Sequence, residues 1–120
     1  GCEDEPTAPR VLPVCRTPVT VTVSAGLTPT FDWMPACRVD VLVVRHAASG
    51  AIDWLVLGDP LDGRAIVPGV RYGTVPSGAI GGNPAEPTPA LEAGTSYVVV
   101  LAVVALPVGP DEVGRREFTP

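Results

Sequence analysis

The feature that most constrains the fold of this chain is the rhythm in which glycine and proline cut it into short apolar segments. The segment Val19–Val23 alternates valine with threonine, which is the pattern of a strand that buries one face. The 15 prolines and 13 glycines break the 120 residues into short pieces, and no piece shows the period of a helix. The sequence therefore predicts an all-β fold.

Seven strands are expected from this rhythm. The other segments that are apolar and bounded by turn residues are Thr28–Trp33, Arg38–Arg45, Ala51–Leu57, Arg64–Val67, Ser96–Leu106 and Arg115–Thr119. The third and fourth strands follow each other closely enough to form a hairpin. Seven short strands favour a sandwich of two sheets.

The chain divides into a short N-terminal segment and one folded domain. Residues 1–14 are rich in acids and prolines and have no apolar period, so we expect an extended tether. Residues 15–120 contain all the expected strands and are numerous enough to bury a core. Within them, the segment 69–89 is rich in glycine and proline, which predicts a long loop with little regular structure.

Two motifs resemble those of fibronectin type III domains. The segment Leu91–Tyr97 reads LEAGTSY and is similar to the family's L-x-P-G-T-x-Y run, with Ala93 in the place of the proline. The segment Phe31–Pro35 reads FDWMP and resembles the family's second strand, whose tryptophan fills the core just before a proline. The resemblance extends over roughly residues 17–119 and implies a seven-stranded, immunoglobulin-like sandwich.

The resemblance also implies structural roles for particular residues. Trp33 would fill the core, and Leu91 and Gly94 would shape the turn that leads into the sixth strand. In this family the tyrosine at the position of Tyr97 bonds through its hydroxyl to the preceding loop. We therefore expect these residues to hold the fold together rather than to bind a ligand.

The chain has three cysteines, Cys2, Cys15 and Cys37. No two of them have the short spacing of a zinc knuckle, so we expect no zinc site. Cys15 and Cys37 flank two expected neighbouring strands, and a disulfide between them would contribute about 3 kcal/mol. The alternative is a pair of buried free thiols in a cytosolic protein.

The spare cysteine lies at the beginning of the acidic tether. The pair Gly1-Cys2 resembles the last two residues of a bacterial lipobox, in which the cysteine becomes the lipidated first residue of the mature protein. The alternative is an incidental cysteine that carries no lipid. The odd number of cysteines and the polar tether favour lipidation. All eight basic residues are arginines, which we interpret as a mark of a GC-rich, bacterial genome.

The sixth strand is apolar on both faces. One face carries Tyr97, Val99, Leu101, Val103 and Ala105. The other carries Val98, Val100, Ala102, Val104 and Leu106. Because a sandwich strand normally exposes one polar face, something is expected to cover the second one. The loop 69–89 is the first candidate, and a patch for a partner or a homodimer is the second.

The segment Ala51–Leu57 contains the second tryptophan, Trp54. Strand alternation puts Ile52, Trp54 and Val56 on one face, opposite Asp53. Trp54 is interpreted as a core or inter-sheet residue, or alternatively as an aromatic contact on a binding face.

The net charge of −5 and the isoelectric point near 4.6 argue against nucleic acid as a partner, because nucleic acid requires a basic surface. They also argue against docking on anionic lipid head groups by charge alone. The longest apolar run, Tyr97–Val108, is too short to span a bilayer as a helix.

Catalytic and metal sites find little support in the sequence. His46 is the sole histidine, and no G-x-S-x-G motif surrounds a serine, so we expect no hydrolase triad. The aspartates near the expected hairpin ends are Asp40, Asp53, Asp59 and Asp62. Acids at such positions are usually solvated turn formers. The segment Asp59–Gly63 lacks the third acid and the later glutamate of a calcium loop. We expect no cofactor, no metal site and an ordinary surface position for His46.

Two function classes remain. The first is a non-enzymatic, extracytoplasmic module with a binding or spacer role, held by a lipid on Cys2 at the periplasmic or cell-surface side of a bacterial membrane. The second is a small enzyme or metal-binding protein that uses loop aspartates and His46. The first needs only features that the sequence contains, so it is the predicted function. Its expected partner is a protein or a glycan, or a second copy in a weak homodimer.

Overall fold

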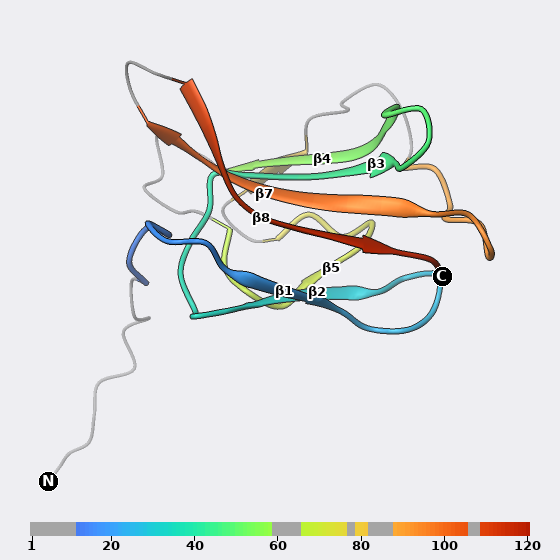
Figure 1. The fold of residues 1–120 in the computed structure, drawn as a ribbon, viewed down its shortest axis with the longest axis horizontal. Helices are drawn as coiled ribbons and strands as arrows, with labels where there is room; N and C mark the ends of the chain where they lie inside the picture. Colours follow the sequence, from blue (N-terminus) through green and yellow to red (C-terminus); the bar gives the residue numbers. More distant parts are fainter. Residues whose placement is uncertain (1–11, 59–65, 77–78, 82–87, 106–108) are drawn as a thin grey trace, which may run out of the picture.

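The structure is a computed structural model. It describes residues 12–58, 66–76, 79–81, 88–105 and 109–120. All regular secondary structure in these residues is β-strand, and the strands form two antiparallel sheets. The sheets lie one above the other in Figure 1, with their inner faces toward each other. The expected all-β fold with two antiparallel sheets is confirmed.

The smaller sheet consists of β1 (Thr20–Val23), β2 (Thr30–Met34) and β5 (Val70–Arg71), in the order β1-β2-β5. In β1 and β2 every second residue is buried, so that Val21, Phe31 and Trp33 point inward. This is the alternation that the sequence predicts for a strand with one face in the core.

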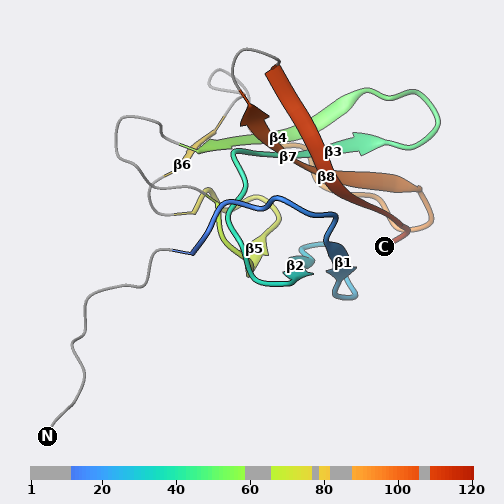
Figure 2. The same cartoon turned by 60° about the vertical axis from the view of Figure 1, so that its left-hand side comes forward.

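The larger sheet contains β6 (Ala79–Gly81), β4 (Ile52–Gly58), β3 (Val41–His46), β7 (Tyr97–Ala105) and β8 (Gly109–Phe118), in this order across the sheet. The strands β3 and β4 form the expected hairpin, and β3 and β7 pair near the centre of the sheet. Figure 2 shows the larger sheet as the upper layer, with β6 beside β4 at its edge.

The hydrophobic core lies between the inner faces of the two sheets. The inward residues of β3 and β7 include Leu42, Val44, Val99 and Leu101, each of them 0% exposed. Phe118 of β8 connects the aromatic residues of both layers, because its ring centroid lies 5.7 Å from that of Phe31 and 5.7 Å from that of Tyr97. Aromatic pairs at this separation add to the free energy of burial.

The two sheets meet along one side, where β8 approaches β1. The β7–β8 pairing shifts after Leu101, so that Val113 is an extra residue in β8 and forms a β-bulge. The carbonyl of Val113 accepts a hydrogen bond of 2.9 Å from the backbone N–H of Val19. A Cβ on the next residue, Gly114, would lie 2.6 Å from Cγ2 of Val19. The approach of β8 to β1 therefore requires glycine at this position.

The disulfide between Cys15 and Cys37 is confirmed, with the two Cα atoms 5.0 Å apart and both side chains buried. Trp33 packs beside this bridge, and its indole Nε1 donates a hydrogen bond of 2.8 Å to the carbonyl of Cys37. The only polar atom of the buried tryptophan side chain thus has a partner. Cys2 and most of the expected tether lie outside the described residues.

The turn before β7 has the bond that the resemblance implies. The hydroxyl of Tyr97 accepts a hydrogen bond of 2.9 Å from the backbone N–H of Glu92. Leu91 is buried beneath this turn, and Gly94 has a φ of +83°, a conformation that glycine adopts without strain. The N–H of Gly94 donates to the carbonyl of Pro120 at 3.1 Å, which ties the turn to the end of β8.

Two of the expected strands differ from those observed. Half of the expected strand Arg64–Val67 lies outside the described residues, and within them Ile66 forms a single bridge with Val39. The expected loop 69–89 contributes β5 to the smaller sheet and β6 to the larger one. Val70 and Tyr72 are buried on either side of the exposed Arg71, which explains why β5 forms inside a segment rich in glycine and proline. The last strand begins at Gly109 rather than at Arg115.

The predicted arrangement of β4 is wrong at its beginning. The β3–β4 pairing places Trp54 opposite Val44 but Ile52 opposite Arg45, so that Asp53 is an extra residue in a β-bulge. Consequently Asp53 and Trp54 are both buried, whereas Ile52 is exposed. Strand alternation alone places Asp53 on the opposite face from Ile52 and Trp54.

The core and the turn before β7 can be tested separately. Replacement Trp33→Ala should lower the free energy of unfolding by about 3–5 kcal/mol, because it empties a large buried volume. Replacement Tyr97→Phe should lower it by only about 1–2 kcal/mol, because it leaves the N–H of Glu92 without its acceptor. Denaturant titration measures both values. Small losses of equal size would contradict the roles assigned to these residues.

Candidate functional site

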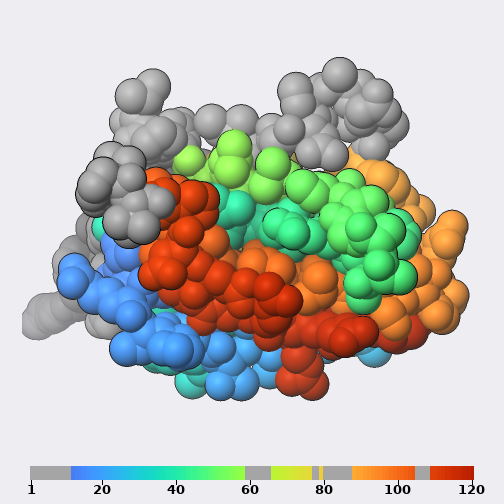
Figure 3. Space-filling view, turned by 45° about the horizontal axis from the view of Figure 1, so that its top comes forward, coloured from blue at the N-terminus to red at the C-terminus, as the bar shows by residue number. Residues whose placement is uncertain are grey.

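The most unusual surface of the molecule is the outer side of the larger sheet. The pairing of β3 with β4 and β7 places alternate residues of the three strands on this side. We call this surface the apolar face, and its residues are Val41, Val43, Leu55, Leu57, Val98, Val100, Ala102 and Val104. Figure 3 shows the outer side of β3, β4, β7 and β8 turned toward the viewer.

Exposure varies across the apolar face. Val104 is 47% exposed at one end of β7, whereas Val100 in the centre is 9% exposed. Val100 lies between Val43 of β3 and Arg115 of β8 in the pairing, so neighbouring side chains on the same face surround it. The apolar side chains are therefore contiguous, but only Leu57 and Val104 at the ends of the face are exposed, whereas Val43, Val100 and Ala102 in its centre are buried.

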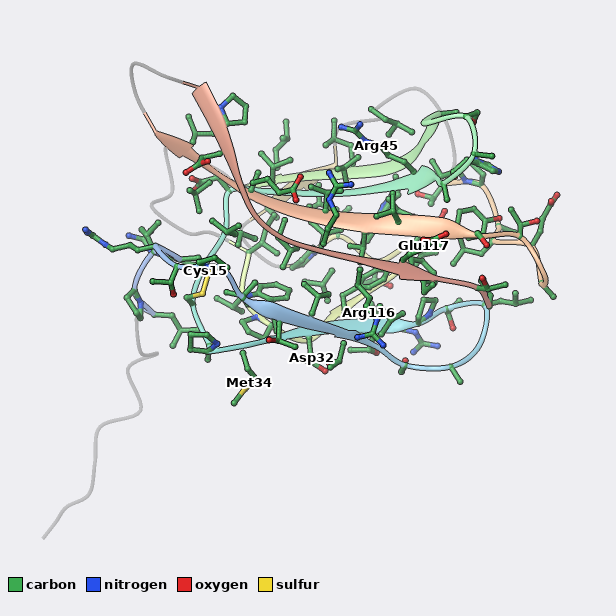
Figure 4. All side chains as sticks on the ribbon, viewed as in Figure 1. Cys15, Asp32, Met34, Arg45, Arg116 and Glu117 are labelled. Carbon is green, nitrogen blue, oxygen red and sulfur yellow. A yellow bond between two sulfur atoms is a disulfide. The ribbon has the colours of Figure 1, made fainter. Side chains whose placement is uncertain are left out.

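Charged residues border the apolar face. Arg115 binds Glu112 through two hydrogen bonds of 2.8 and 2.6 Å, which lower the pKa of that carboxyl group. Val98 is paired with Arg45 on one side and with Glu117 on the other, so these two charges lie on opposite sides of β7. Figure 4 shows Arg45 and Glu117 on the larger sheet, above the strands of the smaller one. The border thus carries both signs of charge.

The outer side of the smaller sheet has the opposite character. Its residues in β1 and β2 are Thr20, Thr22, Thr30, Asp32 and Met34. Arg71 of β5 adds a guanidinium group, which donates a hydrogen bond of 3.3 Å to the hydroxyl of Thr28. Met34 is 69% exposed and is the one apolar residue among those of β1 and β2 on this side. A mostly polar outer side is normal for an antiparallel sheet, so the apolar face is the exception.

The first candidate for covering the second face of β7 is the loop 69–89. Its two strands do not lie over β7, because β5 belongs to the smaller sheet and β6 is separated from β7 by β4 and β3. The remaining residues of this segment, 77–78 and 82–87, lie outside the described part of the chain. Whether the loop or a partner covers the second face of β7 therefore stays a prediction.

Trp54 is buried and does not reach the surface. It is 2% exposed, and its ring meets that of Tyr72 edge to face at a centroid distance of 5.1 Å. The hydroxyl of Tyr72 donates a hydrogen bond of 2.6 Å to the carbonyl of Pro89. Burial, and then the nearby Asp53 carboxylate, raise the pKa of Tyr72. This environment fits the interpretation of Trp54 as a core residue between the sheets.

The structure brings together His46 and Asp53, which the sequence named only as possible members of the second function class. Nδ1 of His46 lies 2.8 Å from Oδ2 of Asp53, close enough for an ion pair when the imidazole is protonated, although the two atoms are not aligned as a hydrogen bond. Asp53 is 8% exposed, and the ring of His46 lies 5.0 Å from that of Tyr97. His46 is therefore not an ordinary surface residue. The bulge turns Asp53 inward, and no sequence signal marks that bulge.

The other aspartates do not join this pair. Oδ2 of Asp40 accepts a hydrogen bond of 2.7 Å from the backbone N–H of Val104, so Asp40 links the beginning of β3 to the end of β7. Asp59 and Asp62 lie outside the described residues. In the part of the chain that the structure describes, no three histidine, cysteine or acidic side chains gather as metal ligands would. The same residues contain no helix that is long and apolar enough to cross a membrane.

Comparisons of this chain with models of protein families, with curated proteins and with solved structures gave no match.

The contact between His46 and Asp53 predicts an effect on stability. Replacement His46→Ala should lower the free energy of unfolding by about 1–2 kcal/mol, because it leaves a buried carboxylate without its partner. This value is below that of a fully buried pair, since His46 is partly exposed. In the background of Asp53→Asn the same replacement should have a smaller effect, which a double-mutant cycle in denaturant measures.

The matched control is Ile52→Ala, which removes an exposed side chain from the same hairpin. It should change the free energy of unfolding by less than about 0.5 kcal/mol. If His46→Ala has the same effect with and without the Asp53 carboxylate, the two side chains do not interact in solution.

Proposed function

We propose that this chain is a non-enzymatic binding module of the bacterial cell envelope. In this proposal it is an immunoglobulin-like or fibronectin type III-like sandwich, held at a membrane by a lipid on Cys2, and it contacts another protein through the apolar face. The apolar face is the observation that carries the proposal. A soluble domain rarely leaves such a surface without a partner, because each exposed apolar side chain favours association.

The strand order supports the immunoglobulin-like type. The strands β1, β2 and β5 form one layer, and β4, β3, β7 and β8 are consecutive neighbours in the other. In the immunoglobulin arrangement the first, second and fifth strands face the third, sixth and seventh, which correspond here to β3, β7 and β8. The fourth strand differs, because β4 pairs with β3 in the larger sheet. The hydrogen bond from the backbone N–H of Glu92 to the hydroxyl of Tyr97 supports the same type, because it resembles the tyrosine corner of such sandwiches at the beginning of their sixth strand.

Two features support an extracytoplasmic location. The Cys15–Cys37 disulfide is of a kind that persists in oxidising compartments and is rare in the cytosol. Cys2 is not part of this bridge, and it follows glycine at the beginning of an acidic, proline-rich segment. A diacylated cysteine could provide a stable anchor without basic residues, since two lipid chains suffice for lasting membrane attachment. This matters for a chain with a net charge of −5.

A protein fits the apolar face better than a glycan. Sugar rings are commonly bound against exposed aromatic side chains. The tryptophans and tyrosines, Trp33, Trp54, Tyr72 and Tyr97, are all buried. The apolar face offers valine, leucine and alanine instead, which complement the aliphatic and aromatic side chains of a protein surface.

The contact of His46 with Asp53 favours a second candidate, a small enzyme. A carboxylate next to a histidine orients the imidazole in many nucleophilic active sites. Such a site also needs a nucleophile, and among the described hydrogen bonds none joins His46 to a hydroxyl or thiol. The contact therefore supports the enzyme proposal less than the apolar face supports binding.

The apolar face can be tested in living bacteria. A photoreactive amino acid in place of Val104, which lies on the exposed end of the face, should form a covalent adduct with a protein after irradiation. The same amino acid in place of Met34, which is more exposed but lies on the smaller sheet, should form little or none. Gel shifts and mass spectrometry of the adducts measure the difference. Equal adducts at both positions, or none at Val104, would argue against the proposal.

The anchor is tested by fractionating cells that express the full precursor. The protein should be found with the membranes, and Cys2→Ser should release it, because the lipid chains supply most of the membrane affinity. The matched control is Cys15→Ser together with Cys37→Ser, which removes the disulfide but leaves the anchor. A Cys2→Ser protein that stays in the membrane fraction would overturn the lipid-anchor part of the proposal.

A further inference from the structure

We propose that the partner of the apolar face is a second copy of this chain. The two copies would pack face to face, related by a two-fold axis that lies between them and runs parallel to β7. This inference rests on the proposed function, because it assigns an occupant to the same surface. It depends on the positions of the charges that border the face.

Arg45 and Glu117 occupy equivalent positions on the two sides of β7. Both are paired with Val98, Arg45 through β3 and Glu117 through β8. Neighbouring strands are about 4.8 Å apart, so two strand spacings of about 10 Å separate the two residues. No ion pair joins them within the described chain. Both side chains are exposed. Arg115 lowers the pKa of the Glu112 carboxyl group, and the charge of Arg45 adds to this effect.

A two-fold axis parallel to β7 exchanges the two sides of that strand. Arg45 of one copy then lies over Glu117 of the other, and Glu117 of the first lies over Arg45 of the second. A symmetric interface needs this kind of self-complementary surface, because each contact occurs twice. A partner bearing one sign of charge would match only one of these two residues. The pattern thus favours a second copy over an unrelated protein.

The rest of the border is compatible with this arrangement. The axis places Arg115 and Glu112 of one copy near Val43 and Val41 of the other, since these residues lie on opposite sides of β7 in the same rows. Arg115 and Glu112 already neutralise each other through two hydrogen bonds. The aliphatic part of an arginine side chain can cover apolar surface while its charged group remains hydrated. No charge needs to be buried without a partner.

The area of the face indicates a weak dimer. The three strands of the apolar face together with the border strand β8, at about 4.8 Å each, and seven residues at about 3.4 Å give about 450 Å² for each copy. The total of about 900 Å² lies below the range of standard stable interfaces and within that of weak, transient ones. The dimer is therefore expected at high local concentration, as on a membrane surface.

Association through strand edges is less favourable. The edge strand β8 carries charged side chains along most of its length, namely Asp111, Glu112, Arg115, Arg116 and Glu117. Charged residues on an edge strand oppose its pairing with another chain. The edge strand on the other side of the larger sheet, β6, has only three residues. The broad face is thus the better surface for contact between copies.

Sedimentation equilibrium of the full chain tests the dimer. All variants carry Cys2→Ser, so that a disulfide through this cysteine cannot link two copies. The parent should associate reversibly, with a Kd between about 10 μM and 1 mM. Replacement Arg45→Glu or Glu117→Arg alone should weaken the dimer about tenfold or more, because like charges then face each other twice. The double variant should restore the parent's Kd to within about threefold.

The matched control is Met34→Glu, which places a new charge on an exposed apolar residue of the other sheet. It should leave the Kd unchanged. Thermal unfolding of each variant should match that of the parent, since Arg45 and Glu117 are exposed.

Three results would overturn the proposal. The parent could remain monomeric up to about 1 mM, the upper limit of the expected Kd. The double variant could be as weak as the single ones, which would exclude the two-fold axis. Met34→Glu could weaken the dimer as much as Arg45→Glu, which would place the contact elsewhere.

If the parent is monomeric while Val104 forms adducts with a different protein in cells, the dimer is excluded and the binding function is retained. If neither occurs, both proposals fail.

Discussion

The pairing of β3 with β7 is the constraint on which the rest of this structure depends. It joins residues 41–46 to residues 97–102 and determines which side of each strand faces the smaller sheet. Both strands are apolar on both sides. A shift of one residue would exchange the inner and outer sets of side chains, yet it would still bury valine and leucine. The hydrophobic pattern alone therefore specifies this register weakly.

Polar contacts at the ends of β7 compensate for the weak pattern. At its beginning the hydroxyl of Tyr97 is held by the N–H of Glu92, and at its end the N–H of Val104 is held by the carboxylate of Asp40. A one-residue shift would move Val104 away from Asp40, and it would turn Tyr97 out of the core. Each of these contacts is worth about 1 kcal/mol or somewhat more, but together they distinguish two registers whose apolar burial is similar. The unique fold thus rests on a few hydrogen bonds added to a large and unspecific hydrophobic term.

Much of the fold could be predicted from the sequence because it follows from local patterns. Alternation located β1 and β2, and turn residues located the β3–β4 hairpin. The positions of Cys15 and Cys37 beside two neighbouring strands predicted the disulfide. The errors occur where an element is defined by a distant partner. The strand β5 exists because Val70 pairs with Phe31 of β2, and β8 begins at Gly109 because it follows β7 along nearly its full length. The alternation of Val70, Arg71 and Tyr72 is too short a signal to mark a strand, and nothing before Arg115 marks the beginning of β8.

The candidate sites also combine features that local sequence patterns predict with features that depend on the pairing of distant strands. The apolar second side of β7 was visible in the sequence, but its extension over β3 and β4 depends on the pairing of three strands. The contact between His46 and Asp53 was missed because a β-bulge changes the period of two by one residue. A single extra residue moved Asp53 from an expected surface position into the interior. Periodicity cannot reveal such a change, since the residues on both sides of the bulge keep their own regular alternation.

The distribution of charge on the larger sheet links its fold to its proposed contact. The charges of β8 protect an edge strand against uncontrolled pairing, and the same strand supplies Glu117 and Arg115 to the border of the apolar face. Charged side chains therefore oppose association through the edge strand β8, which could continue from copy to copy. The apolar face carries no charge, and a two-fold contact through it stops at two copies. An apolar face without a partner would need no complementary charges on its two sides. The opposed positions of Arg45 and Glu117 across Val98 are what an interface between two copies requires, and a smooth apolar surface alone would not provide them.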